Sequence, residues 1–258
     1  MTGCIERHPR MQGEGILPRD VLVWLPPGYG SPPGQRYPVL YMQDGQNIFE
    51  EGNSLSGLSW QADETAGRLM LEGRICKAVI VALYNTEDRQ EEYGDTEKGK
   101  AYMRFVVERV KPVIDDAYRT VAERNGTSVI GSSMGALISF LLAWNHPEVF
   151  SAAACLSPAF VYGGNSVIPL VRGYRGSRKE IRLYVDNGTV GLDRDLQKGC
   201  DEMMEALREK GFVPGRDVEW YFDEGAEHSE AAWSRRLWRS LCFLLGTNLV
   251  LPFSAGCI

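Results

Sequence analysis

Short apolar runs alternate along the chain with longer segments in which apolar residues recur every three or four positions. Several of the short runs are apolar at every position, which is typical of strands that helices cover on both faces. The pattern predicts strands over residues 21–25, 39–42, 78–83, 128–130, 152–156, 181–185 and 218–222. Because strands and helices alternate over the whole chain, we expect an α/β fold with a mainly parallel central sheet and helices on both faces.

The helical periodicity falls between these strands. It predicts helices over residues 60–71, 102–117, 137–144, 196–207 and 233–244. Pro112 is expected to kink the second of them, and Ser229 is expected to cap the last. The Pro/Gly-rich segment 26–38 is interpreted as a surface loop, and segment 85–100 as a long polar loop. Since no segment resembles a linker, we expect one domain over residues 1–258.

The sharpest local motif is the Gly-x-Ser-x-Gly sequence 131–135, centred on Ser133. The motif alone is a weak signal, since about 0.2 chance matches are expected in such a chain, but this one lies between a predicted buried strand and a predicted helix. A strand, a sharp turn and a helix are the setting of a nucleophile elbow, which strains the serine backbone and lifts its hydroxyl above the sheet edge. The alternative is an ordinary Gly-Ser turn. We favour the elbow, with Ser133 as the nucleophile.

A serine hydroxyl needs a base, usually histidine, and the sequence has only three. His8 lies in an N-terminal segment whose order we doubt. His146 ends the helix that starts after Ser133, so it points away from the hydroxyl. His228 follows the last predicted strand and lies at the same carboxyl edge of the sheet as Ser133, where sites form in open α/β sheets. His228 is therefore the predicted base.

The third member of a catalytic triad is a carboxylate that orients the histidine. Asp186 ends a predicted strand, and Asp193 lies in the loop before the next helix, where it could instead be a helix cap. Both remain candidates on position alone. The chain order Ser, Asp, His is that of α/β-hydrolases.

An oxyanion hole in this arrangement uses the N–H group after the nucleophile and one from the loop after an early strand. The first is the amide of Met134. The strand over residues 39–42 runs into Gln43-Asp44-Gly45-Gln46, where Gly45 permits close backbone approach. The second donor is therefore the amide of Gly45 or Gln46. The alternative is a turn that merely uses Asp-Gly.

With these residues in place, the chain resembles the esterase D and enterochelin-esterase-like branch of the α/β-hydrolases over about residues 17–246. The matching segments are 37–49 (YPVLYMQDGQNIF), 88–89 (DR), 92–93 (EY), 111–112 (KP), 118–120 (YRT), 131–135 (GSSMG), 156–160 (LSPAF), and His228 with Trp233. The resemblance implies a single α/β-hydrolase domain that cleaves carboxylic esters, commonly acyl esters of sugars, siderophores or phenolics, without a metal or other cofactor.

The acid region departs from the pattern of that branch. Many relatives place Asp or Glu directly after Gly-Thr-x, and here that position is Gly191. Asp193 is the nearest carboxylate, so we prefer it to Asp186. Some relatives manage with a Ser–His pair alone, which leaves the acid as the least defined member.

Two further sets of residues are candidates for substrate contact. Arg89 and Glu92 either line the site and bind a polar substrate or, as we favour, form an ion pair with each other that orders the long loop. Trp60 and Trp24 either face an acyl or aromatic group or pack in the core, which is the safer interpretation.

The composition of the chain limits the kinds of partner and the cellular compartment that we expect. The chain carries 28 Lys and Arg against 34 Asp and Glu, for a net charge of −6, and has no dense basic run. A nucleic-acid partner is therefore not expected. The six cysteines form no Cys-x-x-Cys pair, and the N-terminus has no apolar signal segment, so we expect a cytoplasmic protein with reduced thiols. The uncharged tail 240–258 is interpreted as a helix end with an apolar extension rather than a membrane span.

The sequence thus predicts a serine esterase that acts on a small-molecule ester, and it also allows a homo-oligomer. Two other classes stay open. One is an acyltransferase or peptidase that uses the same triad. The other is a hydrolase-like binding protein without catalysis, which the intact Ser, His and Gly set argues against.

Overall fold

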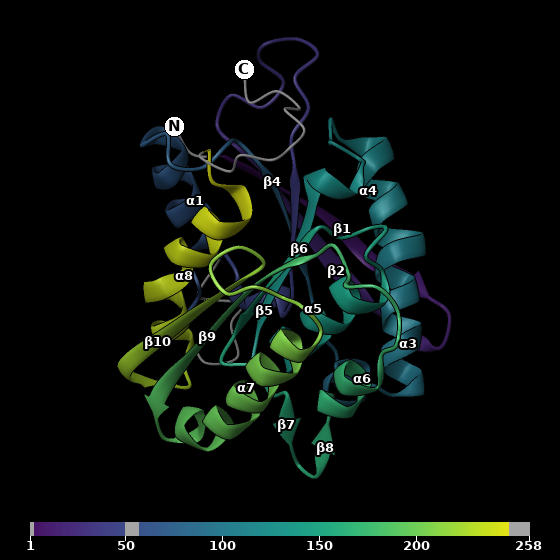
Figure 1. The fold of residues 1–258 in the computed structure, drawn as a ribbon. Coiled ribbons are helices and arrows are strands. Elements are labelled where there is room, and N and C mark those ends of the chain that lie inside the picture. The colour runs from purple at the N-terminus through teal and green to yellow at the C-terminus, as the bar shows by residue number, and fades with distance from the viewer. Residues whose placement is uncertain (1–2, 50–56, 248–258) are drawn as a thin grey trace.

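The apolar runs assemble into one eight-stranded sheet in the computed structural model, which describes residues 3–49 and 57–247 (Figure 1). The strands of this sheet are β1 (Cys4–Gly13), β2 (Ile16–Leu25), β3 (Val39–Met42), β4 (Val79–Leu83), β5 (Thr127–Ser132), β6 (Ala152–Leu156), β9 (Arg182–Val190) and β10 (Val218–Glu227). Their order is β1-β2-β4-β3-β5-β6-β9-β10. All pairs from β4 to β10 are parallel, and only β1 and β2 run antiparallel to their neighbours.

Helices cover both faces of the sheet, as the sequence predicts (Figure 1). They are α1 (Ala62–Leu71), α2 (Arg89–Glu92), α3 (Glu97–Arg104), α4 (Lys111–Ala117), α5 (Met134–Asn145), α6 (Ile168–Gly173), α7 (Leu192–Glu209) and α8 (Glu230–Leu245). A small hairpin of β7 (Val161–Tyr162) and β8 (Asn165–Ser166) follows β6. The predicted α/β fold with a mainly parallel sheet is confirmed.

Alternate residues of the strands feed two separate cores. Val39 and Tyr41 of β3 pack on the side of α3 to α7, whereas Leu40 and Met42 pack on the side of α1 and α8. Successive side chains of a strand point to opposite faces, so a strand covered on both sides must be apolar throughout. All four of these side chains are at most 1% exposed. This double burial explains why the central strands were visible in the sequence.

The N-terminal segment differs from our expectation. Residues 4–13 form the edge strand β1, which pairs antiparallel with β2, and His8 lies in it. Our doubt about the order of this segment was wrong. Most of β1 is exposed, so its sequence lacks the apolar alternation that marks a half-buried strand.

The predicted helix over residues 102–117 is present but divided. Helix α3 passes into a π-helical segment, Phe105–Val110, and then into α4, whose first turn holds Pro112. Proline has no N–H to give to the preceding turn, and a wider π turn just before it accommodates that loss. The predicted irregularity at Pro112 therefore takes the form of a π turn before the proline.

Two other boundaries shift. The helix predicted over 60–71 begins at Ala62, so Trp60 precedes it, and the polar loop 85–100 contains α2 and the start of α3. The end of α8 packs in the core as expected, with Leu241, Leu244 and Leu245 buried. The predicted apolar extension at 248–258 lies outside the described residues. None of the described helices combines the length and the apolar content that crossing a bilayer requires.

Candidate active site

Three sharp turns follow three strands at the carboxyl edge of the sheet. Asp44 comes two residues after β3, Ser133 directly after β5 and Ser157 directly after β6. Their φ angles are 56°, 56° and 44°, a region that non-glycine residues rarely adopt. Strained residues of this kind concentrate at functional sites, where the surrounding structure holds them in place. This edge of the sheet is therefore the candidate site.

Ser133 sits at the N-terminus of α5 in the geometry of a nucleophile elbow. Both flanking glycines are required there. A Cβ atom at Gly131 would lie 2.4 Å from the carbonyl oxygen of Gly135, and one at Gly135 would lie 2.8 Å from Oδ2 of Asp44. The Ser133 amide donates to the carbonyl of Leu156 at 2.9 Å, which ties the turn to β6. Ser133 remains partly accessible to solvent. The Gly-x-Ser-x-Gly spacing thus has a steric reason in this chain.

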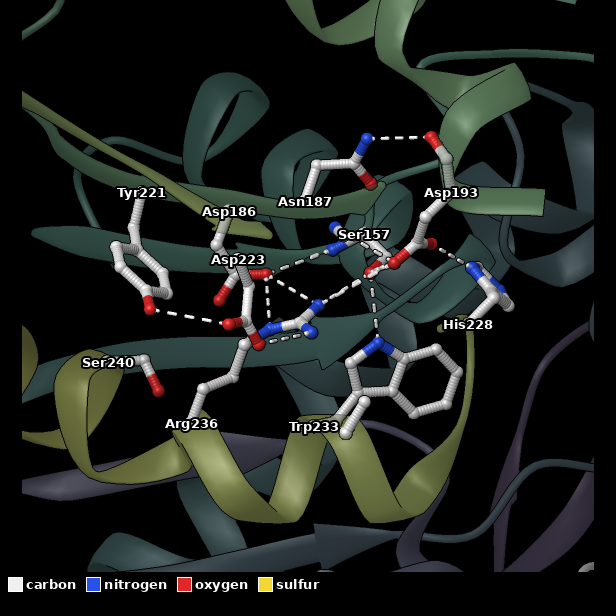
Figure 2. Close-up of polar contacts among 12 residues, drawn as sticks. Ser157, Asp186, Asn187, Asp193, Tyr221, Asp223, His228, Trp233, Arg236 and Ser240 are labelled. Carbon is white, nitrogen blue, oxygen red and sulfur yellow. Dashed lines mark hydrogen bonds and ion pairs between the residues drawn. The ribbon is translucent and has the colours of Figure 1, made fainter. Parts of the chain in front are cut away.

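His228 directly follows β10, and its imidazole meets Asp193. The Nδ1 atom of His228 lies 2.6 Å from Oδ1 of Asp193 (Figure 2). The Asp193 side chain is 0% exposed, whereas the His228 side chain is 14% exposed. The imidazole and the indole of Trp233 are nearly perpendicular, with ring centroids 4.9 Å apart. One ring nitrogen is thus committed to a buried carboxylate, while part of the ring remains accessible.

The carboxylate of Asp193 is held at both oxygens. Oδ2 accepts hydrogen bonds from the hydroxyl of Ser157 and the amide of Gly188, each at 2.9 Å. A Cβ atom at Gly188 would lie 2.4 Å from Oδ2, so only glycine permits this approach. Since these donors and His228 all point at the carboxylate, it acts as acceptor throughout, and Nδ1 of His228 carries the proton. Nε2 of His228 is then free to accept a proton.

Asp186, the alternative acid, lies in a different contact. Its Oδ1 accepts from Nε of Arg236 at 3.0 Å, and the side chains of both residues are at most 3% exposed. Burial raises the pKa of Asp186 to about 6 despite the lowering effect of Arg236. The structure therefore brings Asp193, and not Asp186, to the imidazole. Asp193 lies inside the first turn of α7, whose cap is Gly191, so it is not the helix cap that we considered.

Ser133 and His228 directly follow β5 and β10 of the same sheet, and β6 and β9 lie between these two strands. The turn after β6 contacts both sides. Ala159 donates its amide to the Ser133 carbonyl at 3.2 Å, and Ser157 donates its hydroxyl to Asp193. A continuous set of contacts therefore runs from the Ser133 turn to the Asp193–His228 pair.

The loop after β3 approaches the elbow through Gln43 and Asp44, which lie against Gly135. Residues Gly45–Asn47 form a short 3-10 helix, and the side chain of Gln46 is clamped by two contacts with Asn85, at 2.6 and 3.1 Å. Within residues 3–49 and 57–247, the backbone amides of Gln46 and Met134, each at the start of a helix, donate to no backbone carbonyl outside their own helices. These two amides therefore remain candidates for an oxyanion hole, which needs donors aimed at the reacting oxygen.

The expected Arg89–Glu92 ion pair is absent, because each residue has another partner. Arg89 binds Asp44 through Nε and Nη2 at 2.7 and 2.8 Å, and Glu92 binds Arg19 at 2.6 and 2.9 Å. The Arg19–Glu92 pair is fully buried, while the Arg89 side chain is 29% exposed. Arg89 thus orders the β3 loop and still presents an accessible edge.

The tryptophans pack rather than line an open site. Trp60 and Trp24 are both 2% exposed, and Trp60 lies against Trp233 with centroids 6.0 Å apart. Because so little of Trp60 is accessible, the structure favours the packing interpretation over the alternative in which Trp60 contacts substrate.

The other two histidines contact residues outside the candidate site. His8 bonds the hydroxyl of Tyr118 at 2.8 Å, and His146 lies 3.2 Å from Glu148. Over the part of the chain that the structure describes, no three His, Cys, Asp or Glu side chains gather closely enough to hold a metal ion.

Sequence reasoning missed the group behind Asp193. Arg236 was not singled out, and Ser157 and Trp233 entered only through the family resemblance. One signal was available for Arg236. It lies three residues after Trp233 and one before Leu237, on the apolar side of the last helix. A charged residue at such a position indicates a buried ion pair.

Comparison with known proteins supports the same fold. The chain is 28% identical over 225 residues to an endo-1,4-beta-xylanase/feruloyl esterase of Xylanibacter ruminicola, which covers 83% of this chain and 28% of that protein. The chain thus spans less than a third of the length of this curated relative.

Solved structures resemble the chain over nearly its full length. A ferulic acid esterase superposes with a TM-score of 0.77 at 20% identity, covering 95% of this chain and 99% of the other. The enterobactin esterase of Shigella flexneri gives 0.74 at 15% identity, covering 95% of this chain and 59% of the other. The model of the family described as "Putative esterase" matches residues 17–244. With this match over most of its length, the chain belongs to the esterase family of the α/β-hydrolase fold that the sequence motifs indicated.

Proposed function

We propose that the protein hydrolyses carboxylic esters through an acyl-enzyme formed on Ser133. The observation that carries this proposal is the 2.6 Å contact between Nδ1 of His228 and buried Asp193, at the sheet edge where Ser133 occupies a strained elbow. A nucleophile, a base and an orienting acid on three separate elements form the arrangement that acyl transfer needs.

Each residue has a chemical role in this scheme. Nε2 of His228 accepts the proton of Ser133 as the hydroxyl attacks the ester carbonyl, and Asp193 stabilises the resulting imidazolium. The amides of Met134 and Gln46 hold the oxyanion. His228 then protonates the leaving alkoxide, and a water that His228 activates releases the acid. The N-terminus of α5 adds a favourable dipole at the oxyanion.

The substrate class follows from similarity and from one side chain. Relatives are named for feruloyl and enterobactin ester cleavage. We propose a small polar ester, with a phenolic or sugar component, as the substrate of this chain. Arg89 remains the candidate for contact with a polar substituent, since its guanidinium is partly exposed next to the β3 loop.

We also propose a reducing, cytoplasmic location. Among the described residues, Cys4, Cys155, Cys200 and Cys242 form no disulfide, which suits such a compartment.

Hydrolysis of p-nitrophenyl esters of increasing chain length, together with acetylated and feruloylated sugars, tests the activity. Ser133→Ala is expected to abolish turnover while the protein stays folded. Ser151→Ala is the matched control. The Ser151 hydroxyl donates to the Thr127 carbonyl at the start of β5, which is the edge of the sheet opposite to Ser133. Turnover retained by pure Ser133→Ala would refute the assignment.

A further inference from the structure

A buried group of residues lies behind the Asp193–His228 pair and contacts it from the side of the core. Ser157 contributes the hydroxyl at its centre, and α8 contributes Trp233 and Arg236 (Figure 2). The backbone of Ser157 is strained, with a φ angle of 44°, and the residue is 0% exposed. A fully buried, strained serine directly after a core strand is a costly feature, which calls for a function.

The hydrogen of the Ser157 hydroxyl has only one direction to take. Its oxygen accepts hydrogen bonds from Nε1 of Trp233 at 3.0 Å and from Nη2 of Arg236 at 2.6 Å. Both groups can only donate, and a hydroxyl has two acceptor positions and one hydrogen. The two acceptor positions are therefore filled, and the hydrogen must point at Oδ2 of Asp193, 2.9 Å away. The donors on α8 thus fix the orientation of the Ser157 proton.

Arg236 is itself held by buried and half-buried acids. Asp186 accepts a hydrogen bond from Nε of Arg236 at 3.0 Å, and the carboxylate of Asp223 lies 3.4 Å from Nη1 of Arg236. Nη2 of Arg236 lies 4.0 Å from Oδ2 of Asp193. The planar guanidinium can therefore reach Asp186 and Ser157 together, which a lysine ammonium, with its single nitrogen, would not do with the same geometry.

We propose that Arg236 and Ser157 are positioning residues of the catalytic acid: Arg236, anchored on Asp186, orients the Ser157 hydroxyl, and this hydroxyl fixes the Asp193 carboxylate against His228. The proposal rests on the proposed function, since it assigns a task only if Asp193 orients the base. It makes Asp186 the counter-ion of a positioning residue and removes it from the reaction.

A double-mutant comparison tests this chain of contacts. Hydrolysis of p-nitrophenyl acetate is measured for Ser157→Ala, Asp193→Asn and the double variant, with kcat and KM separated. Ser157→Ala is expected to lower kcat by about 10- to 100-fold and to leave KM near the parent value, because a small misplacement of a reacting group is costly. In the Asp193→Asn background, the same change is expected to have no further effect.

Arg236→Lys provides a second, independent variant. It is expected to lower kcat in the same way, and Arg236→Lys/Ser157→Ala is expected to be no slower than Ser157→Ala alone, since both act through one hydroxyl. Ser240→Ala and Arg235→Lys are the controls on α8. Ser240 is buried, and its hydroxyl donates to the Leu237 carbonyl of its own helix, whereas Arg235 is exposed.

The proposal would be overturned, while the esterase function stands, by either of two results. One is that the fold-losses in kcat multiply in the double variants. The other is that kcat is unchanged in both Ser157→Ala and Arg236→Lys. Failure of both single variants to fold, with the two controls folded, would show a purely structural role and overturn it equally. The proposed function itself would instead be rejected if the parent chain showed no turnover and Ser133 did not react with a fluorophosphonate.

Discussion

Nε of Arg236 lies 3.0 Å from Oδ1 of Asp186, in a contact that leaves both side chains almost inaccessible. Seven residues further along the chain, Asp193 meets His228 instead. Two aspartates that looked equivalent in the sequence therefore have different partners, and α8 supplies the residue that separates them. The distinction can be measured in activity and in stability.

Asp193→Asn is expected to lower kcat/KM by about 10⁴-fold, because an amide in place of the carboxylate favours the wrong imidazole tautomer. Asp186→Asn is expected to cost far less than Asp193→Asn, because Asp186 does not contact His228 and acts only as the counter-ion of Arg236. Steady-state hydrolysis of p-nitrophenyl acetate by the two variants checks this. The reverse ranking would make Asp186 the acid.

The free energy of unfolding should depend on pH because Asp186 is buried. Burial raises its pKa from 3.8 to about 6, so the folded state holds this proton more tightly than the unfolded chain. The resulting stabilisation is present below the unfolded pKa and is lost as the pH rises through about 6. Relative to Asp186→Asn, the parent chain is expected to lose up to about 3 kcal/mol of unfolding free energy between about pH 4 and pH 7.

Urea unfolding at several pH values measures that difference. A free-energy gap between the parent and Asp186→Asn that stays constant over this range would contradict the raised pKa.

Gly135→Ala is expected to damage the oxyanion loop. The new Cβ would lie 2.8 Å from Oδ2 of Asp44, so this carboxylate, which Arg89 holds, or the turn that carries it must shift. Loss of one oxyanion donor costs about 10²- to 10³-fold in kcat. Gly67→Ala is the control, because a Cβ there meets nothing within 4 Å in α1 and should stabilise the helix by about 1 kcal/mol. Unchanged kcat in Gly135→Ala would show that the loop can shift without loss.

The buried Arg19–Glu92 pair predicts a strong asymmetry in stability. Arg19→Met leaves the Glu92 carboxylate buried without its charge partner and is expected to cost about 3–5 kcal/mol, while Arg19→Met/Glu92→Leu should recover much of that loss. Arg7→Met removes a pair with Asp20 in which the arginine is 65% exposed, and it should cost less than about 1 kcal/mol. Equal losses for Arg7→Met and Arg19→Met in urea unfolding would contradict this account.

The sequence predicts what local patterning controls. Buried parallel strands are apolar on both faces, so β3 to β6 were visible, and Gly131 and Gly135 mark the turn around Ser133 because no larger residue fits. The edge strand β1 was missed because its exposed side chains follow no apolar alternation.

Ion-pair partners were not readable, since they depend on which elements pack together. Arg89 meets Asp44 and Glu92 meets Arg19, each across more than 40 residues of chain. The strained turn at Ser157 was equally hidden, because nothing in Leu156-Ser157-Pro158 indicates a positive φ angle.

The most direct test of the account is covalent labelling with a fluorophosphonate, followed by peptide mass spectrometry. Reaction of this probe requires an activated serine, so the account predicts modification at Ser133 in the parent chain and none in Ser133→Ala or His228→Ala. A label on a different serine, or an unlabelled Ser133 in the folded parent chain, would contradict the central claim that His228 activates Ser133.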